Sequence, residues 1–163
     1  MHVSDMSKRV ESLFPIKKII APIDGSENAS RAAEVAIRIA KEQGSELEVL
    51  HIVTISGLLV SAPVGVGTPA VNLEDYYEIS ENEGRKLVER VVQQAKRAGV
   101  EARGEVLRSV SSPAYTITEN AKGENADLIV IGTRGLGGFK KLLLGSVSSG
   151  VVTHAQCAVL VIR

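Results

Sequence analysis

The sequence contains one cysteine and no tryptophan, and its 19 basic and 19 acidic side chains cancel. A single cysteine, Cys157, excludes a disulfide framework within the chain and a cysteine-based metal cluster. Such sparse use of cysteine is typical of a reducing compartment. Because neither sign of charge dominates, the composition gives no reason to expect nucleic acid or an acidic partner.

Long apolar runs are also missing, since none approaches the roughly 20 residues needed to cross a bilayer. The first residues, Met1 to Met6, lack the basic and then apolar pattern of a signal peptide. We therefore expect a cytoplasmic protein with no membrane segment. A chain of 163 residues can bury a substantial core as one domain, and 44% hydrophobic residues with 3% aromatic ones predict an aliphatic interior.

What the sequence does contain is a regular alternation of strand-like and helix-like segments. The hydrophobic patterns predict strands at 17–23, 46–53, 100–107, 128–131 and 158–162, and helices at 27–43, 74–98, 112–123 and 146–154. Strands that alternate with helices predict an α/β fold with a parallel sheet and right-handed crossovers. The last two strands are continuous apolar runs, which predicts that both of their faces are buried. The alternating pattern of 100–107 predicts a strand with one exposed face, near a sheet edge.

Two segments fall outside this alternation. Residues 1–15 are polar, and the apolar spacing of Val10, Leu13 and Phe14 allows either a tail or a short docked helix. Residues 16–163 are then expected to form a single domain. The glycine- and proline-rich connection at 54–73 is longer than compact domains usually tolerate, so it is either a binding loop that acts as a lid or a mobile connection.

Two predicted turns contain residues suited to binding a ligand. Residues 24–26 (Asp-Gly-Ser) follow the first strand, and residues 132–135 (Gly-Thr-Arg-Gly) follow the fourth. Ligands of open parallel sheets bind beyond the carboxyl ends of the strands, where the strand order reverses. For both turns to line one crevice, strands one and four must be neighbours. The sequence therefore predicts the strand order 3-2-1-4-5, with helices on both faces in a Rossmann-like arrangement.

Glycines after the fourth strand predict two close approaches of a ligand to the main chain. Gly132 and Gly135 come directly after a buried strand, where the lack of a side chain lets a bulky group come near. Nine residues later, Gly145-Ser146 opens a short helix, and the N–H groups and dipole of a helix start favour an anion. Two approaches across one spacer predict a single ligand contacted twice, with phosphate as the natural candidate.

Three other nucleotide or phosphate motifs do not fit this stretch. A Walker A loop needs glycine-lysine-serine or threonine at its end, and Gly138-Phe139-Lys140 does not supply it. A dinucleotide fingerprint would require glycine at position 140 and would follow the first strand. A phospho-receiver domain would need paired acids near strand one and an aspartate at the end of strand three, where the chain has Arg108-Ser109.

The spacing Gly132-x2-Gly135-x9-Gly145-Ser146 resembles the ATP-binding motif of the universal stress protein family, glycine-x2-glycine-x9-glycine-serine or threonine. The opening strand and turn at 20–26 and the closing strand at 157–162 are also similar to those of the family. The resemblance covers roughly residues 16–163. It implies an adenine-nucleotide-binding domain of the adenine nucleotide alpha hydrolase-like type, related to the Rossmann fold, and this chain has every glycine of the motif.

The resemblance also implies roles for individual residues. One group would border the adenosine, a second would follow the ribose and phosphates, and a third would present N–H and hydroxyl groups to the β- and γ-phosphates; in order these are Pro22, Asp24 and the backbone of Val53, then Ile131, Gly132, Thr133, Arg134 and Gly135, then Gly145, Ser146, Val147 and Ser148. Lys140 and Lys141 would either add positive charge or be solvated surface. A divalent ion, Mg²⁺ or Mn²⁺, is expected to be held mainly by the phosphates and water.

Simpler structural explanations exist for several of these residues. Asp24 could cap the first helix, Ser146 could be only an N-cap, and Gly132 could serve a tight turn. His51 is expected to be a buried histidine with a hydrogen-bond partner. Cys157 is expected to begin a buried strand and to be unreactive.

The sequence thus predicts an ATP-binding sensor or switch of the stress response. The sequence has neither the paired acids nor the Ser-His-Asp set that would indicate an efficient enzyme. The alternatives are slow ATP hydrolysis, helped by a partner, or a ligand-free interaction module. If the strand at 158–162 lies at the sheet edge, antiparallel pairing of Val159 to Ile162 across a two-fold axis predicts a homodimer, which the resemblance also implies. The downstream partner is not predicted.

Overall fold

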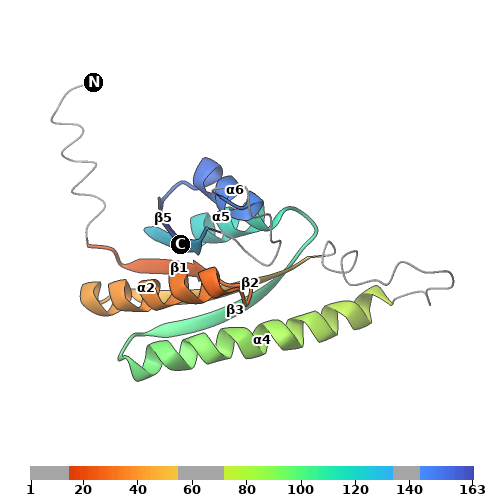
Figure 1. The fold of residues 1–163 in the computed structure, drawn as a ribbon, viewed down its shortest axis with the longest axis horizontal. Helices are drawn as coiled ribbons and strands as arrows, with labels where there is room; N and C mark the ends of the chain where they lie inside the picture. The colour runs from red at the N-terminus through yellow and green to blue at the C-terminus, as the bar shows by residue number, and fades with distance from the viewer. Residues whose placement is uncertain (1–14, 55–71, 134–143) are drawn as a thin grey trace.

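The computed structural model describes residues 15–54, 72–133 and 144–163. These residues form a five-stranded parallel sheet of order β3-β2-β1-β4-β5 with four helices, which confirms the predicted fold class and strand order (Figure 1). Along the chain the elements are β1 (Lys18–Pro22), α2 (Glu27–Gln43), β2 (Glu46–Thr54), α4 (Leu73–Arg97), β3 (Ala102–Ser109), α5 (Pro113–Gly123), β4 (Leu128–Gly132), α6 (Ser146–His154) and β5 (Ala158–Ile162).

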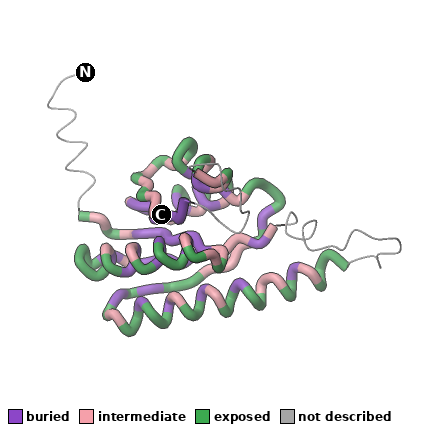
Figure 2. The backbone as a smooth tube through the Cα atoms, in the orientation of Figure 1, coloured by how far each residue is buried: buried purple, intermediate pink, exposed green. Residues whose placement is uncertain are grey.

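The helices cover both faces of the sheet, and each face has its own aliphatic cluster. Helices α2 and α4 pack on one face, around Ile19, Val49 and Val130. Helices α5 and α6 pack on the other face, around Ile20, Leu50 and Ile129. Figure 2 shows the buried backbone concentrated in the central strands and in the inward sides of the helices. Among the described residues, no helix is long and apolar enough to cross a membrane.

Local capping explains where α2 begins and ends. The hydroxyl of Ser26 accepts a hydrogen bond from the Ala29 N–H at 3.2 Å, which is the usual N-cap arrangement. Gly44 ends the helix in the left-handed region, with φ of 68°, which glycine adopts without strain. Between the caps, six small or branched side chains are buried against the sheet, namely Ala29, Ala32, Ala33, Ala36, Ile37 and Ala40. This stripe lets α2 lie close over β1 and β4.

Two expectations about the strands need correction. The third strand begins at Ala102 and not at Val100, because the Val100 N–H closes the end of α4 by donating to the Ala95 carbonyl oxygen at 3.0 Å. The fifth strand is not buried on both faces, because β5 is an edge strand whose residues are all intermediate or exposed. The apolar run at 158–162 therefore marks an uncovered edge. The prediction that strand three lies at the other edge is confirmed.

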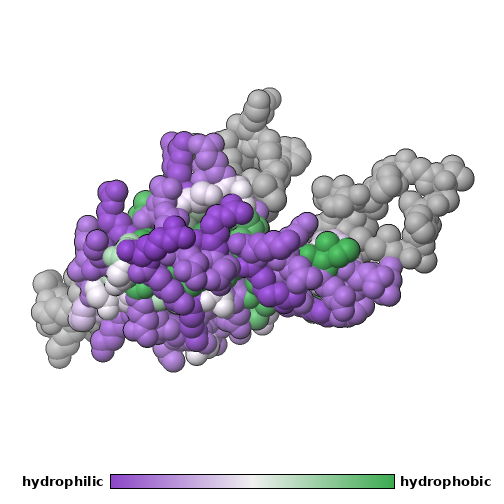
Figure 3. Space-filling view, turned by 90° about the horizontal axis from the view of Figure 1, so that it is seen from below, coloured by the Kyte–Doolittle hydropathy of each residue, from purple (hydrophilic) through white to green (hydrophobic). Residues whose placement is uncertain are grey.

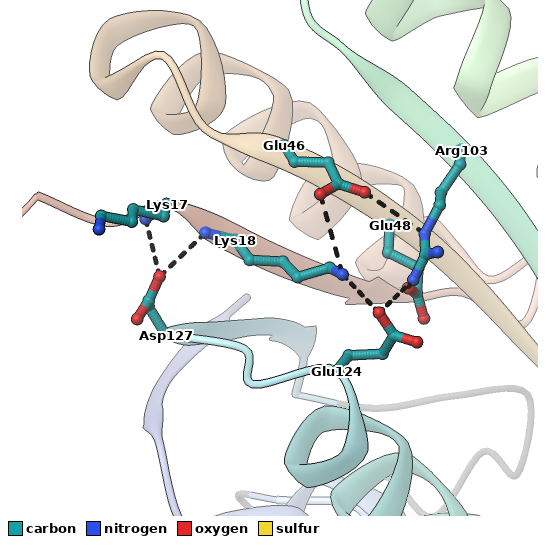
Figure 4. Close-up of polar contacts among 7 residues, drawn as sticks. All are labelled: Lys17, Lys18, Glu46, Glu48, Arg103, Glu124 and Asp127. Carbon is teal, nitrogen blue, oxygen red and sulfur yellow. Dashed lines mark hydrogen bonds and ion pairs between the residues drawn. The ribbon is translucent and has the colours of Figure 1, made fainter.

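A cluster of ionic side chains ties the strands together at their amino ends (Figure 4). The Arg103 guanidinium on β3 pairs with Glu48, which is fully buried on β2, and with Glu124 after α5. Lys18 on β1 hydrogen-bonds to the same Glu124 carboxylate. Asp127, just before β4, accepts the Lys18 N–H at 2.9 Å. Four strands are thereby connected by side chains at the end of the sheet opposite the predicted site.

At the carboxyl end of β4, Gly132 lies directly against the first turn of α2. A Cβ atom added at Gly132 would lie 2.7 Å from the Asn28 carbonyl carbon and 2.9 Å from the Ala29 nitrogen. Both atoms belong to the main chain and cannot move aside without shifting the helix. This glycine is therefore required by packing alone, whatever it also does for a ligand.

We expect Gly132→Ala to lower the free energy of unfolding by about 1–3 kcal/mol, because overpacking forces the backbone of α2 to shift. The matched control is Gly123→Ala, since an added Cβ at Gly123 meets nothing within 4 Å and the residue is the last of α5. The control should keep or raise the stability, by up to about 1 kcal/mol. Urea unfolding followed by circular dichroism measures both, and equal effects of the two substitutions would contradict the packing argument.

The ionic cluster makes a prediction about acid stability. The hydrogen bond from Lys18, reinforced by Arg103, holds the pKa of Glu124 below its ordinary value of 4.5. A carboxyl group whose pKa is lower in the folded state stabilises the fold above the unfolded pKa and loses that contribution as the pH falls. Glu124→Gln should therefore be less stable than the parent chain at neutral pH, and the difference should shrink as the pH falls below 4.5 and disappear once the pH is below the lowered pKa of the folded state.

The control for this comparison is Glu119→Gln, an exposed carboxylate of α5 for which the described residues offer no ion pair. It should leave the dependence of stability on pH unchanged. A constant difference between Glu124→Gln and the parent chain at every pH would contradict the role given to the ionised carboxylate.

Candidate functional site

The candidate site lies at the carboxyl ends of β1 and β4, which are neighbours in the sheet. Ile19 and Ile20 of β1 pair with Leu128 and Ile129 of β4. After the paired segments the two strands lead into the Asp-Gly-Ser turn at 24–26 and into Thr133. Val53, which the resemblance places beside the adenosine, is buried near the end of the next strand, β2. The structure thus brings the predicted turn residues together at the carboxyl ends of the central strands, where the strand order reverses.

The turn after β1 is built by its own side chains. The Asp24 carboxylate accepts the Ser26 N–H at 2.9 Å, and Gly25 has φ of +84°, the left-handed region that favours glycine. Ser26 is the N-cap of α2, so the idea that Asp24 caps this helix is wrong. The Asp24 side chain is partly exposed at the sheet edge.

A backbone hydrogen bond joins the two parts of the glycine motif. The Gly145 N–H donates to the Thr133 carbonyl oxygen at 2.7 Å. The Ser148 hydroxyl, buried in α6, donates to the Gly132 carbonyl oxygen at 2.6 Å. On the other side the Thr133 N–H donates to Ile162 of β5 at 2.7 Å. The start of α6 is therefore fixed directly beside the end of β4.

These bonds change the account of the individual donors. Gly145 is the N-cap of α6 and makes no side-chain cap bond, so Ser146 is the first helical residue and the idea that it is the N-cap is wrong. The Gly145 N–H and the Ser148 hydroxyl are both engaged by protein carbonyls. A helix gives no internal acceptor to the N–H groups of its first turn, which here belong to Ser146, Val147 and Ser148. Ser146 is exposed and Val147 is partly exposed.

Several predicted residues of the motif lie outside the described part of the chain. They are Arg134, Gly135, Lys140 and Lys141, together with the connection at 55–71. Of the twelve predicted site residues, the structure therefore locates ten. Six of these ten residues are buried, namely Pro22, Val53, Ile131, Gly132, Thr133 and Ser148.

A charged network at the same end of β3 was not predicted from the sequence. Arg108 pairs with Glu74 at 2.8 Å and with Glu81, and its guanidinium lies 4.7 Å from the centre of the Tyr77 ring. The hydrogen bond from Arg108 lowers the pKa of Glu81, and the two carboxylates raise the pKa of Arg108. Nothing local in the sequence indicates these pairs, because they depend on how α4 lies over β3. The Arg108 guanidinium is therefore already paired with two carboxylates of α4.

The remaining reactive side chains lie apart from one another. His51 on β2 contacts the Ile23 carbonyl oxygen through Nδ1 at 2.8 Å and is partly buried against Gly84 of α4, which confirms a histidine with a partner. Burial raises the pKa of the Cys157 thiol, which keeps it in the less reactive protonated form. Within the described ranges, no three His, Cys, Asp or Glu side chains gather as a metal site would require.

A pocket of about 360 Å³ lies beside the start of α6, between it and the start of α5. Ser146 and Val147 line it from one side, and Ser112 and Tyr115 line it from the other. The first turn of α6 is thus accessible from this pocket.

Comparison with known proteins supports an assignment to a family. The family model described as the universal stress protein family matches residues 15–163. The universal stress protein YxiE of Bacillus subtilis is 35% identical over 147 residues, which are 90% of this chain and 98% of that protein. Each match covers about nine tenths of the chain, and the family model includes every described residue.

Solved structures agree with the fold. The universal stress protein UspA from Lactobacillus plantarum superposes with a TM-score of 0.77 at 28% identity, over 91% of this chain and 98% of that one. A universal stress protein family protein from Arabidopsis thaliana, solved with AMP bound, has a TM-score of 0.60 at 21% identity and covers 90% of each chain. On these matches, and on a glycine motif whose two parts meet at the switch point of the sheet, the chain belongs to the universal stress protein family.

Proposed function

We propose that this chain is an ATP-binding universal stress protein that acts in the cytoplasm as a nucleotide-dependent sensor or switch. The main observation in its favour is the bond between Gly145 and Thr133, which brings both parts of the glycine motif beside the acidic turn of β1. A structural relative with AMP bound supports the choice of adenine nucleotides. The motif in this chain retains every glycine and the serine at position 146.

In this proposal the adenosine lies at the carboxyl ends of β1 and β2. Pro22 and the backbone of Val53 border the base, and the partly exposed Asp24 carboxylate accepts hydrogen bonds from the nucleoside. Asp24 is held in place by its bond to the Ser26 N–H at 2.9 Å, so it is oriented before the ligand arrives. Ile131 and Thr133 follow the ribose on the β4 side.

The phosphates lie toward α6. The first-turn N–H groups of Ser146, Val147 and Ser148 donate to the phosphate oxygens, aided by the positive end of the helix dipole. In this proposal Gly135 leaves room for a phosphate beside the main chain and Arg134 adds positive charge, whereas Gly132 is taken up by its contact with α2. The Gly145 N–H and the Ser148 hydroxyl act indirectly, since they hold α6 against the end of β4.

The described residues of the site fit a metal ion that is carried by the nucleotide. Asp24 is the only carboxylate among the ten described site residues, which is too few to hold Mg²⁺ or Mn²⁺ by protein ligands. The ion would neutralise charge on the phosphates, with water filling most of its coordination sphere. The protein side of the site then needs only donors, which the start of α6 supplies.

We do not propose efficient catalysis. Hydrolysis of ATP needs a positioned base or an arginine near the γ-phosphate. Asp24 lies at the adenosine end in this proposal, and Arg108 is paired with Glu74 and Glu81. Slow hydrolysis, stimulated by a partner, is the second candidate function, and steady turnover well above the buffer background would favour it.

The open edge at β5 supports a homodimer. Leu160 of β5 is 36% exposed and Val152 of the adjacent α6 is 48% exposed, so the edge is flanked by apolar groups. Antiparallel pairing of Val159 to Ile162 with a second copy would satisfy the outward backbone groups and bury these side chains. Because the Thr133 N–H donates to Ile162, such a dimer would place the nucleotide site next to the interface.

The nucleotide site is tested with Gly135→Val. The branched side chain would stand where a phosphate approaches the main chain, so we expect affinity for MgATP to fall by at least about tenfold while the fold is kept. Isothermal titration calorimetry measures the affinity, and circular dichroism measures the fold. The matched control, Gly138→Val, changes a glycine of the same spacer that the motif does not require. Equal loss in both variants, or no saturable binding by the parent chain, would contradict the proposal.

The dimer is tested with Leu160→Lys. Two lysines brought together near a two-fold axis would repel one another, so we expect monomers where the parent chain forms dimers. Val110→Lys is the control, because Val110 is 94% exposed at the opposite side of the sheet, directly after β3. Sedimentation velocity at micromolar concentration distinguishes the two states. A monomeric parent chain, or a Leu160→Lys variant that stays dimeric, would overturn the arrangement.

A further inference from the structure

The sheet has two open edges, and their chemistry differs. The β5 edge is apolar, as described above. The β3 edge faces a groove of about 1000 Å³ between the strand and α4. The side of the molecule on which α4 lies is mostly hydrophilic (Figure 3). The two edges are therefore suited to different partners.

The hydrogen bonds of the sheet determine which backbone groups of β3 point outward. The Leu47 N–H donates to the Glu101 carbonyl oxygen at 2.9 Å, and Leu47 is in register with Ala102. In a parallel ladder this phase directs the backbone groups of Glu101, Arg103 and Glu105 toward β2. The N–H and C=O groups of Gly104 and Val106 then point away from the sheet.

Both of these outward-facing residues line the groove. Gly104 and Val106 form its strand side together with Glu105, and α4 forms its other side. Gly104 has no side chain to cover its own backbone, and Val88 of α4 would lie 2.0 Å from a Cβ atom added there. The helix therefore packs on the face of the strand while the edge itself stays accessible.

Cations dominate the helix side of the groove. Lys86, Arg90 and Arg97 recur at helical spacing and line it, together with Arg85. Arg85 is occupied by Glu81 and Asn82. In the part of the chain that the structure describes, Lys86, Arg90 and Arg97 have no ion pair. The neutral net charge of the sequence thus conceals a local excess of positive charge.

The carboxylates at the groove do not cancel this excess. Glu105 accepts a hydrogen bond from Asn120 at 3.4 Å, and Glu89 accepts one from Gln93 at 2.6 Å. These two carboxylates are outnumbered by the four cations that line the groove. An occupant of the groove would therefore meet, on one side, backbone groups that have no partner among the described residues and, on the other, positive charge.

We propose that the β3 edge binds an extended acidic segment of a partner protein, which adds to the sheet as a sixth strand. The segment pairs its backbone with Gly104 and Val106, and its acidic side chains reach Lys86, Arg90 and Arg97. A second copy of this chain fits less well, because a two-fold axis along β3 would bring like charges together. The inference concerns a surface separate from the nucleotide site and does not depend on ATP binding.

The first test uses the full chain and a fluorescein-labelled octapeptide of alternating glutamate and valine as the probe. Fluorescence anisotropy should show saturable binding that weakens as salt rises above about 0.1 M. An octapeptide of alternating lysine and valine should not bind. Binding of neither peptide, or equal binding of both, would overturn the proposal, since the cations would then only guard the edge against unwanted pairing.

Charge reversal tests the role of the helix. The double variant Lys86→Glu with Arg90→Glu should weaken probe binding by roughly tenfold or more. The matched control, Lys41→Glu with Lys96→Glu, makes the same change in net charge at exposed positions outside the groove. Equal weakening by both double variants would show non-specific attraction and overturn the proposal.

Amide hydrogen exchange tests strand addition itself. In the free chain the Gly104 and Val106 amides should exchange rapidly, while the inward-facing Arg103 and Glu105 amides should be protected. Saturating probe should protect Gly104 and Val106. Binding without this protection would place the peptide elsewhere and overturn the proposal, as would protection in the free chain that rises with protein concentration, which would indicate self-pairing.

A proline substitution gives an independent check on the backbone. Val106→Pro removes an outward N–H and no ladder bond, so the fold should remain while probe affinity falls several-fold. Val106→Ala keeps the N–H and is the control for the lost side chain. Undiminished binding by Val106→Pro relative to Val106→Ala would contradict strand addition, and the anisotropy and exchange measurements on the parent chain remain decisive if the proline variant fails to fold.

Discussion

The parallel pairing of β1 with β4 is the constraint on which the rest of this structure depends. It places Ile19 and Ile20 beside Leu128 and Ile129, although more than a hundred residues separate the strands in sequence. All strands of the described sheet run in one direction, so their carboxyl ends lie on the same side of the sheet. The turn after β1 and Gly132 at the end of β4 lie on the same side of the sheet for this reason.

The two ends of the sheet have divided roles. At the amino ends, the ionic cluster around Arg103 and the buried Glu48 ties the strands to one another. At the carboxyl ends, backbone bonds position α6, chiefly the one between Gly145 and Thr133. A rigid sheet fixed at one end can present oriented main-chain donors at the other. This division suits a binding protein, because the donors are positioned before the ligand arrives.

Much of the fold was predictable from the sequence because its patterns are local. Ser26 and Gly44 mark the ends of α2, and both α2 and α6 begin and end as the sequence predicted. The burial of β5 was mispredicted, because an apolar strand at the edge of a sheet and one in its interior have the same hydrophobic sequence pattern. The start of β3 was misplaced because Val100 is used to close α4.

The candidate site was predictable in its location and less so in its details. Glycine spacing and strand order together indicate the edge, but they do not show which donors the protein itself consumes. The engagement of Gly145 and Ser148, and the close contact of Gly132 with α2, depend on how separate elements pack. Tertiary packing likewise determines the pairing of Arg108 and the position of the α4 cations that, among the described residues, have no ion pair and line the groove beside β3.

The central claim is that the site at the carboxyl ends of β1 and β4, beside the start of α6, binds an adenine nucleotide. Titration of isotope-labelled protein with MgATP, followed by the chemical shifts of its backbone amides, tests it most directly. The account predicts saturable shifts that cluster at residues 24–26, at Thr133 and at residues 146–148, with Gly104 and Val106 unaffected. Shifts concentrated at any other surface, or no saturable shifts at all, would contradict it.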